Sequence, residues 1–326
     1  VSTLGGIGVR GPDAAEFLNR VYTFAYAKQL AGTVRYALMT NEAGVVIDDG
    51  VVCRLEEQNF YVTATTGGVD AVYRKMLQWN AQWRLQVTLL NLTSAYAAVN
   101  LAGPLSRQVL EPLCDGIELD KEAFPYLGVR QGTVAGIPAI LLRVGFVGEL
   151  GYEIHVPQHS GEALWDALMQ AGESAGIRPV GIEAQRLLRL EKGHVIIGQD
   201  TDAMSHPVEL QMQWAIARKK GYFVGGRTLE VLESKPLTRV LVGFCCEDGS
   251  DIPKESHLVV DGDKMTGRVT SCGWSPTLKK AIGLAYVAPD SAAPGSKITI
   301  AIGRGSVSAE VVSLPFYDAD GLQQAL

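Results

Sequence analysis

A glutamate that follows a run of glycines is the first candidate for chemistry in this sequence. Gly145, Gly148 and Gly151 give the backbone freedom to turn sharply. Glu153 comes directly after them, in a segment where apolar and polar residues alternate as in a half-buried strand. The two oxygens of its carboxylate can accept two parallel N–H groups from a flat heterocycle. Alternatively, Glu153 is a solvated residue on the polar edge of a hairpin, and the spacing by itself favours this simpler interpretation.

The other residues that often support catalysis are scattered along the chain. The five histidines show no spacing typical of metal ligands, and the five cysteines include no C-x-x-C pair. We therefore predict no metal site. The odd number of cysteines favours reduced structural thiols in a cytosolic protein over a disulfide framework.

Composition and charge describe an ordinary globular protein. The 326 residues are enough for two or three domains with cores of their own. The net charge of −6 gives no basic surface for nucleic acid or an anionic membrane, so neither partner is predicted. Membrane-length apolar runs and a signal-peptide pattern are both missing, and we expect a cytoplasmic location. The sequence begins at Val1 in an already structured pattern, which favours a piece of a larger polypeptide.

One pattern occurs twice in the first half of the chain. Alternating apolar residues lead into a Gly-Pro pair, and an amphipathic segment follows with apolar residues at the same offsets from the glycine. The first copy has Ile7, Val9, Gly11-Pro12, Phe17, Leu18 and Val21, and the second has Val99, Leu101, Gly103-Pro104, Val109, Leu110 and Leu113. Proline is well placed in a first helical turn. The repeat predicts a duplicated strand–helix unit, and therefore an α+β region built of related halves.

The first copy also satisfies the dinucleotide fingerprint G-x-G-x-x-G at residues 6–11. Almost no chain precedes it to form the required strand, and Ile7 and Val9 have the pattern of a strand themselves. An acidic residue at the position of the ribose contact is also missing. We reject this fingerprint.

The strands and helices around the candidates follow from periodicity. We expect a hairpin of residues 34–38 and 45–54, in which Asp48 and Asp49 face opposite ways and cannot form an acid–base pair. A strand at 60–65 leads into a helix at 69–79. Later helices are expected after Ser160, as an N-cap, and at 182–192.

From Thr238 onward the character of the sequence changes to short alternating segments separated by turns. This pattern predicts a small all-β barrel. Lys235-Pro236 is the expected boundary, which gives domains at 1–236 and 237–326.

Several stretches together resemble the glycine-cleavage T-protein (aminomethyltransferase) family of folate-binding proteins. They occur in the family's order over nearly the whole chain, and they are residues 1–4, 11–18, 35–38, 145–157, 190–193 and 275–278. The resemblance implies a T-protein-like folate-binding region followed by the C-terminal β-barrel.

The resemblance also implies roles for individual residues. Glu153 occupies the place of a glutamate that hydrogen-bonds the pterin ring of tetrahydrofolate, and Tyr36 that of a tyrosine lining the folate pocket. Without the family, Tyr36 is equally well a core tyrosine. Trp274 is expected in a loop that leans toward the folate, or as a plug of the barrel. Two positions depart from the family: Thr65 stands where an ungapped alignment expects its essential aspartate, and Gln185 stands where it has an arginine.

These departures bear on the reaction. Neither Thr65 nor Gln185 moves protons near neutral pH, so the catalytic group is left unassigned. Such a site suits an electrophilic one-carbon donor, such as an imine or formaldehyde, that the folate nitrogen attacks through proximity alone. Residues 63–68, 190–202 and 214–220 resemble the C-terminal half of the α subunit of heterotetrameric sarcosine oxidase. That likeness implies capture of the unit as 5,10-methylenetetrahydrofolate, with a flavin only through a partner subunit.

Other interpretations stay open at this point. A stand-alone aminomethyltransferase is disfavoured by Thr65 and Gln185, and a non-catalytic folate-binding or scaffold module fits the missing charged groups. The family's iron–sulfur-maintenance branch carries a cysteine where His194 stands, which argues against it. Residues 218–220 are either an ordinary charged surface or a contact for the anionic tail of folate.

Overall fold

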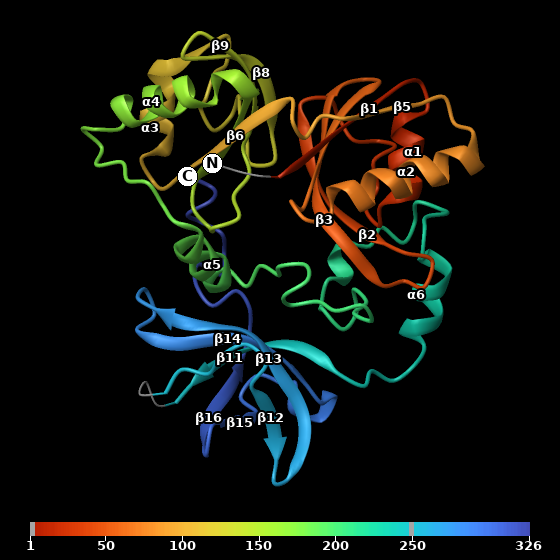
Figure 1. The fold of residues 1–326 in the computed structure, drawn as a ribbon, viewed down its shortest axis with the longest axis vertical. Helices are drawn as coiled ribbons and strands as arrows, with labels where there is room; N and C mark the ends of the chain where they lie inside the picture. The colour runs from red at the N-terminus through yellow and green to blue at the C-terminus, as the bar shows by residue number, and fades with distance from the viewer. Residues whose placement is uncertain (1–3, 248–250) are drawn as a thin grey trace.

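The computed structural model describes residues 4–247 and 251–326, and it consists of three lobes (Figure 1). Two lobes each contain a five-stranded sheet with helices, and the third is a closed barrel. This confirms the predicted α+β region and C-terminal barrel. Residues 1–3 of the first resembling stretch lie outside the described residues. In the described residues, no helix is long and apolar enough to cross a membrane.

The first lobe packs two helices against one face of its sheet. Its strands, in spatial order, are β2 (Thr33–Thr40), β3 (Val46–Glu56), β4 (Asn59–Ala64), β1 (Gly5–Arg10) and β5 (Thr88–Asn91). The helices are α1 (Ala14–Val21) and α2 (Val69–Trp83), which extends one turn beyond its predicted end. Apolar residues alternate on the strands and recur at helical spacing on the helices, so the two sets meet in one core. That core includes Ile7, Val9, Phe17, Leu18, Val52, Phe60, Val62 and Met76.

The second lobe also consists of a five-stranded sheet with two helices, but its strand order differs from that of the first. Its strands, in spatial order, are β6 (Tyr96–Ala102), β10 (Gly151–Pro157), β9 (Ile137–Leu142), β8 (Val129–Val134) and β7 (Cys114–Asp115). The helices α3 (Ser106–Leu110) and α4 (Gly161–Ala171) cover one face. Ser160 precedes α4 as predicted, but its side chain makes no capping hydrogen bond.

The predicted duplication holds at the Gly-Pro turn. Gly11 and Gly103 have φ of 133° and 126°, a region that glycine enters without strain. In both copies the glycine carbonyl accepts a hydrogen bond from the N–H three residues later, at 3.1 Å from Ala14 and 3.0 Å from Ser106. The sheets around the turns differ, because β1 lies between β4 and β5 whereas β6 is an edge strand.

The two sheets contact each other through the faces opposite their helices. One buried cluster joins Val34, Cys53 and Tyr61 of the first sheet to Ile140 and Leu142 of the second. A main-chain hydrogen bond also joins the two lobes, since the Val34 N–H on β2 donates to the Leu127 carbonyl at 2.7 Å. Side chains on these two faces therefore share one interior region between the lobes.

The barrel closes the third side of the molecule. Its strands, in spatial order, are β11 (Val240–Cys246), β14 (Lys280–Val287), β13 (Lys264–Ser275), β12 (Leu258–Asp261), β15 (Lys297–Ile302) and β16 (Gly305–Val312). Helix α5 (Ile182–Glu191) lies between the second lobe and the barrel, and α6 (Gly226–Glu233) lies between the first lobe and the barrel (Figure 1). The predicted boundary at Lys235-Pro236 falls between α6 and β11.

The end of α5 is bound firmly to the barrel. Arg189 donates a hydrogen bond to Ser271 of β13 at 2.7 Å and forms an ion pair at 2.6 Å with Asp200; the two ion-paired side chains are 1% and 0% exposed. Glu191 accepts hydrogen bonds from Ser275 at 2.5 Å and Thr277 at 3.1 Å. Two of the stretches that carry the family resemblance, 190–193 and 275–278, are therefore direct partners, and their role is to fix the barrel against α5.

Candidate functional site

Glu153 lies on β10 and faces the interior region between the two sheets. Its strand neighbours are Asn100 on β6 and Leu142 on β9. The side chain is 13% exposed. Burial is the main cause that raises the pKa of the Cys53 thiol, and the negative charge of Glu153 adds to it, so the carboxylate lies near β3 of the opposite sheet. The simpler interpretation of Glu153 as a solvated hairpin residue is thereby weakened.

A second carboxyl group faces the same interior region from β3. The Tyr36 hydroxyl on β2 donates a hydrogen bond to Asp49 at 2.7 Å. Burial raises the pKa of Asp49 to about 7; the hydrogen bond from Tyr36 lowers it, and the nearby charge of Asp48 raises it further. A carboxyl group that titrates near neutral pH is suited to general acid–base catalysis. Asp49 is not among the residues that the sequence pattern predicted for the site.

Asp49 and Cys53 lie on the same face of β3. They are four residues apart, so their Cα atoms are separated by about 13 Å at roughly 3.3 Å per residue. Because Cys53 is close to Glu153, the two carboxyl groups lie toward opposite ends of this segment of β3.

The neighbouring Asp48 has a different function. As predicted, it points away from Asp49 and has different partners. Its carboxylate accepts hydrogen bonds from Thr65 Oγ1 at 2.6 Å and from the Thr65 N–H at 3.2 Å, just before α2. Thr65 Oγ1 in turn accepts the Gly68 N–H at 3.1 Å. Thr65 and Asp48 therefore hold the turn that leads into α2 by accepting the N–H groups of Gly68 and Thr65, a structural task.

An aromatic pair flanks Asp49. The rings of Tyr36 and Trp214 lie 5.2 Å apart with an angle of 36° between their planes. Trp214 is 62% exposed, so its outer face is open to a planar ligand. The bond to Asp49 satisfies the Tyr36 hydroxyl, as both the folate-pocket interpretation and that of a core tyrosine require. Trp214 lies within the resembling stretch 214–220 but is not one of the predicted site residues.

Two further predicted residues lie where α5 meets the barrel. Gln185 is half-buried on α5. Trp274 was predicted in a loop, and this is wrong, because it belongs to β13 and pairs with Ala281. Its side chain is 41% exposed, so it does not plug the barrel. The two elements touch at Gly273, since a Cβ built there would lie 3.0 Å from a methyl group of Leu187.

Two of the three charged residues at 218–220 bind to other parts of the protein. Arg218 forms an ion pair with Glu233. The Lys220 ammonium donates to the carbonyls of Asn19, Tyr22 and Phe24. Burial lowers the pKa of Lys220 to about 7. Lys219 is exposed and is the member of the run left for a ligand tail.

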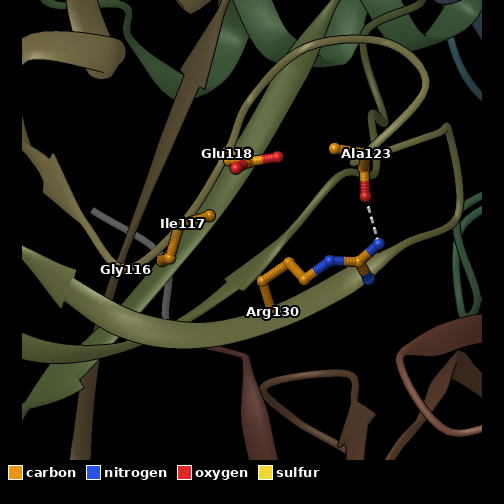
Figure 2. Close-up of a pocket in the computed structure, with 5 residues that line it drawn as sticks. All are labelled: Gly116, Ile117, Glu118, Ala123 and Arg130. Atoms are coloured by element: carbon orange, nitrogen blue, oxygen red, sulfur yellow. Dashed lines mark hydrogen bonds between the residues drawn. The ribbon is translucent and has the colours of Figure 1, made fainter.

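A separate cavity of about 520 Å³ lies in the second lobe, as Figure 2 shows. It is lined by Gly116, Ile117, Glu118, Ala123 and Arg130. The Arg130 guanidinium is occupied by main-chain carbonyls, including those of Ala123 and Gly32. This cavity contains none of the predicted site residues, and we do not assign the function to it. Within the described part of the chain, no group of three or more His, Cys, Asp or Glu is arranged to hold a metal ion.

Comparisons with known proteins agree with this architecture. The sequence matches the family model "GCVT N-terminal domain" over residues 1–220 and "Glycine cleavage T-protein C-terminal barrel domain" over residues 239–318. The chain therefore belongs to the glycine-cleavage T-protein family, a folate-binding family of enzymes. The fold is similar to the crystal structure of the glycine cleavage system aminomethyltransferase T from Bartonella henselae, with a TM-score of 0.88 and 26% identity over 98% of this chain and 85% of that one.

Relatives with two different names match over the whole chain. An aminomethyltransferase of Halothermothrix orenii is 35% identical over 97% of this chain and 87% of its own length. The sarcosine oxidase subunit alpha of Corynebacterium sp. strain P-1 is also 35% identical, over 98% of this chain and 34% of that subunit. The chain thus spans about a third of the sarcosine oxidase subunit and most of the aminomethyltransferase.

Proposed function

We propose that this chain binds tetrahydrofolate and transfers a one-carbon unit onto it, forming 5,10-methylenetetrahydrofolate. The observation that carries the proposal is the pair of carboxyl groups on facing sheets, Glu153 with its carboxylate largely buried and Asp49 with a pKa of about 7. Tetrahydrofolate supplies a nucleophilic nitrogen for the one-carbon unit and a pterin ring whose N–H groups match a carboxylate.

Each residue of the site has a separate task in this proposal. Glu153 accepts the pterin N–H groups and fixes the orientation of the ring. Tyr36 and Trp214 offer aromatic surface to the planar part of the ligand. Asp49 holds or accepts a proton at its carboxyl group, since both forms are populated near neutral pH. Tyr36 holds the Asp49 carboxyl group in place through its hydroxyl.

We further propose that the one-carbon donor is an imine or formaldehyde released by a flavoprotein partner subunit, as in a sarcosine oxidase-like complex. The 35% identity to a sarcosine oxidase subunit alpha and the uncharged Gln185 support this donor. An aminomethyl donor, as in a stand-alone aminomethyltransferase, is the second candidate. It is supported by the similarly close relatives of that name and by Asp49, which can transfer the proton that a leaving amine needs.

Calorimetric titration of the chain with tetrahydrofolate tests the site. We expect Glu153→Ala to weaken binding by about 2–3 kcal/mol, because it removes charge-assisted hydrogen bonds and strands their donors. Glu173→Ala, at an exposed position, is the control and should bind as the wild type does. Equal affinity of the folded Glu153→Ala protein and the wild type would remove Glu153 from the site.

The donor is tested by the products. Ammonia release from an aminomethylated lipoyl carrier would establish the aminomethyltransferase. Accelerated capture of formaldehyde, relative to tetrahydrofolate without the chain, would support the sarcosine oxidase-like function. Tight folate binding with neither activity would identify a non-catalytic module and refute the transfer.

A further inference from the structure

A buried histidine lies beside Glu153. His155 is two residues further along β10, on the same face, and it is 1% exposed. Its Nε2 atom lies 3.5 Å from Glu153 Oε2. Its Nδ1 atom lies 3.2 Å from the Tyr61 hydroxyl on β4 of the opposite sheet. Glu153, His155 and Tyr61 therefore form a row that crosses from one sheet to the other.

The protonation of the Tyr61 hydroxyl determines which atom donates in each hydrogen bond of this row. Burial, together with the nearby Cys53, Tyr96 and Glu153, raises the pKa of Tyr61, so its hydroxyl keeps its proton. The hydroxyl then has a proton to donate to His155 Nδ1. A neutral imidazole that accepts at Nδ1 carries its own proton at Nε2. This tautomer directs an N–H toward the Glu153 carboxylate.

The Nε2–H of His155 requires an acceptor, and Glu153 is the nearby candidate. It is buried and lacks a hydrogen-bond partner among the described residues. A buried N–H without an acceptor is costly, and Glu153 Oε2 at 3.5 Å is within a small side-chain adjustment of bonding distance. Cys53, which also lies near Glu153, is a neutral thiol because burial raises its pKa.

The position of Tyr61 depends on the absence of a side chain at Gly6. A Cβ built at Gly6 would lie 2.6 Å from the Tyr61 hydroxyl, so the residue at this position of β1 has no room for a side chain. The Tyr61 ring also makes edge-to-face contacts with Tyr96 and with His155, with centroids 5.6 Å and 5.3 Å apart. These neighbours surround the phenol of Tyr61, and its hydroxyl faces His155.

We propose that His155 is a positioning residue, which donates its Nε2–H to Glu153 Oε2 and is locked in this tautomer by Tyr61. The bond fixes the rotation of the Glu153 carboxylate, so that Oε1 and the second lone pair of Oε2 face the ligand. The effect on affinity rests on the proposed folate-binding function, whereas the tautomer and its coupling to Glu153 do not.

The tautomer is measured first, by nitrogen NMR of the 15N-histidine-labelled chain without ligand. We expect the Nε2–H form of His155 in the wild type, a mixture of tautomers in Tyr61→Phe, and a shifted Nε2 resonance in Glu153→Gln. An Nδ1–H tautomer in the wild type, or an Nε2 resonance that ignores Glu153→Gln, would overturn the proposal whether or not the chain binds folate.

The effect on the ligand is measured second, with two substitutions that separate the N–H from the ring. His155→Phe keeps a ring but removes the donor, and we expect tetrahydrofolate to bind roughly tenfold more weakly, with KM raised and kcat changed less. His155→Gln retains an N–H at a similar reach and should bind within about threefold of the wild type. Equal affinity of the folded His155→Phe protein would refute the positioning role. If the wild type does not bind, the proposed function fails while the NMR result stands.

Discussion

Asp49 provides a quantitative test, because its pKa links the candidate site to the stability of the fold. Folding raises the pKa of this carboxyl from 3.8 to about 7. The folded protein therefore binds more protons than the unfolded chain between these two values. The stabilising contribution is complete below the unfolded pKa and is lost as the pH rises through the folded pKa.

The magnitude follows from the two pKa values. At 1.36 kcal/mol per pH unit, this one group lowers the free energy of unfolding by about 2.5 kcal/mol between pH 5 and pH 8. Asp49→Asn abolishes the titration but keeps an acceptor for the Tyr36 hydroxyl. We expect the variant to gain about 2.5 kcal/mol relative to the wild type over the same range.

The assay is urea-induced unfolding at pH 5 and pH 8, followed by tryptophan fluorescence. Tyr36→Phe is the companion variant, because the hydrogen bond from Tyr36 lowers the pKa of Asp49. Without this bond the free energy of unfolding should depend on pH more strongly than it does in the wild type. If the stability difference between Asp49→Asn and the wild type is the same at both pH values, the carboxyl is not perturbed and cannot be the acid–base group proposed above.

Two other substitutions test the structural interpretation of neighbouring residues. Arg189→Met leaves the fully buried Asp200 carboxylate without its cation and should destabilise the chain by about 3–5 kcal/mol, which a urea titration would detect; Arg189→Met with Asp200→Leu should recover part of the loss. Thr65→Asp places a carboxylate against Asp48, at a contact that is 2.6 Å in the wild type, so the melting temperature should fall while the affinity for tetrahydrofolate stays the same. A change of affinity in a stably folded Thr65→Asp protein would place residue 65 in the folate site.

The elements of the fold were predictable because their patterns are local. Alternation indicated β1, β6 and the barrel strands, and Gly-Pro turns marked the ends of the first two. The strand pattern of Ile7 and Val9 and the missing acidic residue were reasons to reject the dinucleotide fingerprint. The structure adds a physical reason for that last result: Gly6 lies within β1 beneath the Tyr61 hydroxyl, and Gly11 is needed at a positive φ. The limits of elements were less certain, as Trp274 illustrates. Ser275-Pro276 suggested a loop, but pairing with Ala281 on β14 extends β13 through Trp274 and Ser275.

The candidate site was harder to predict because its groups meet across strands. The family resemblance implies a carboxylate at the end of β4, where this chain has Thr65. The carboxyl group that faces Tyr36 comes from β3, where Asp49 pairs with Leu38. This register passes a bulge between Met39 and Thr40, which the spacing of residues does not reveal. Two consecutive acidic residues on a strand were nevertheless an available indication, since one of them had to face the side of Tyr36.

Asp49 also alters the comparison between the two candidate donors. The preference for an imine or formaldehyde depended on a site without any group that moves protons, and a carboxyl with a pKa of about 7 supplies such a group. Asp49 offers a carboxyl group in place of the aspartate that is missing at Thr65, whereas the charge that is missing at Gln185 has no such substitute among the predicted site residues. Gln185 lies on α5, whose end is fixed to the barrel by Arg189 and Glu191, so a substitution on this helix should leave the fold intact. Gln185→Arg restores the charge that the family resemblance implies at this position, and a comparison of the two donors with this variant tests whether residue 185 influences the choice between them.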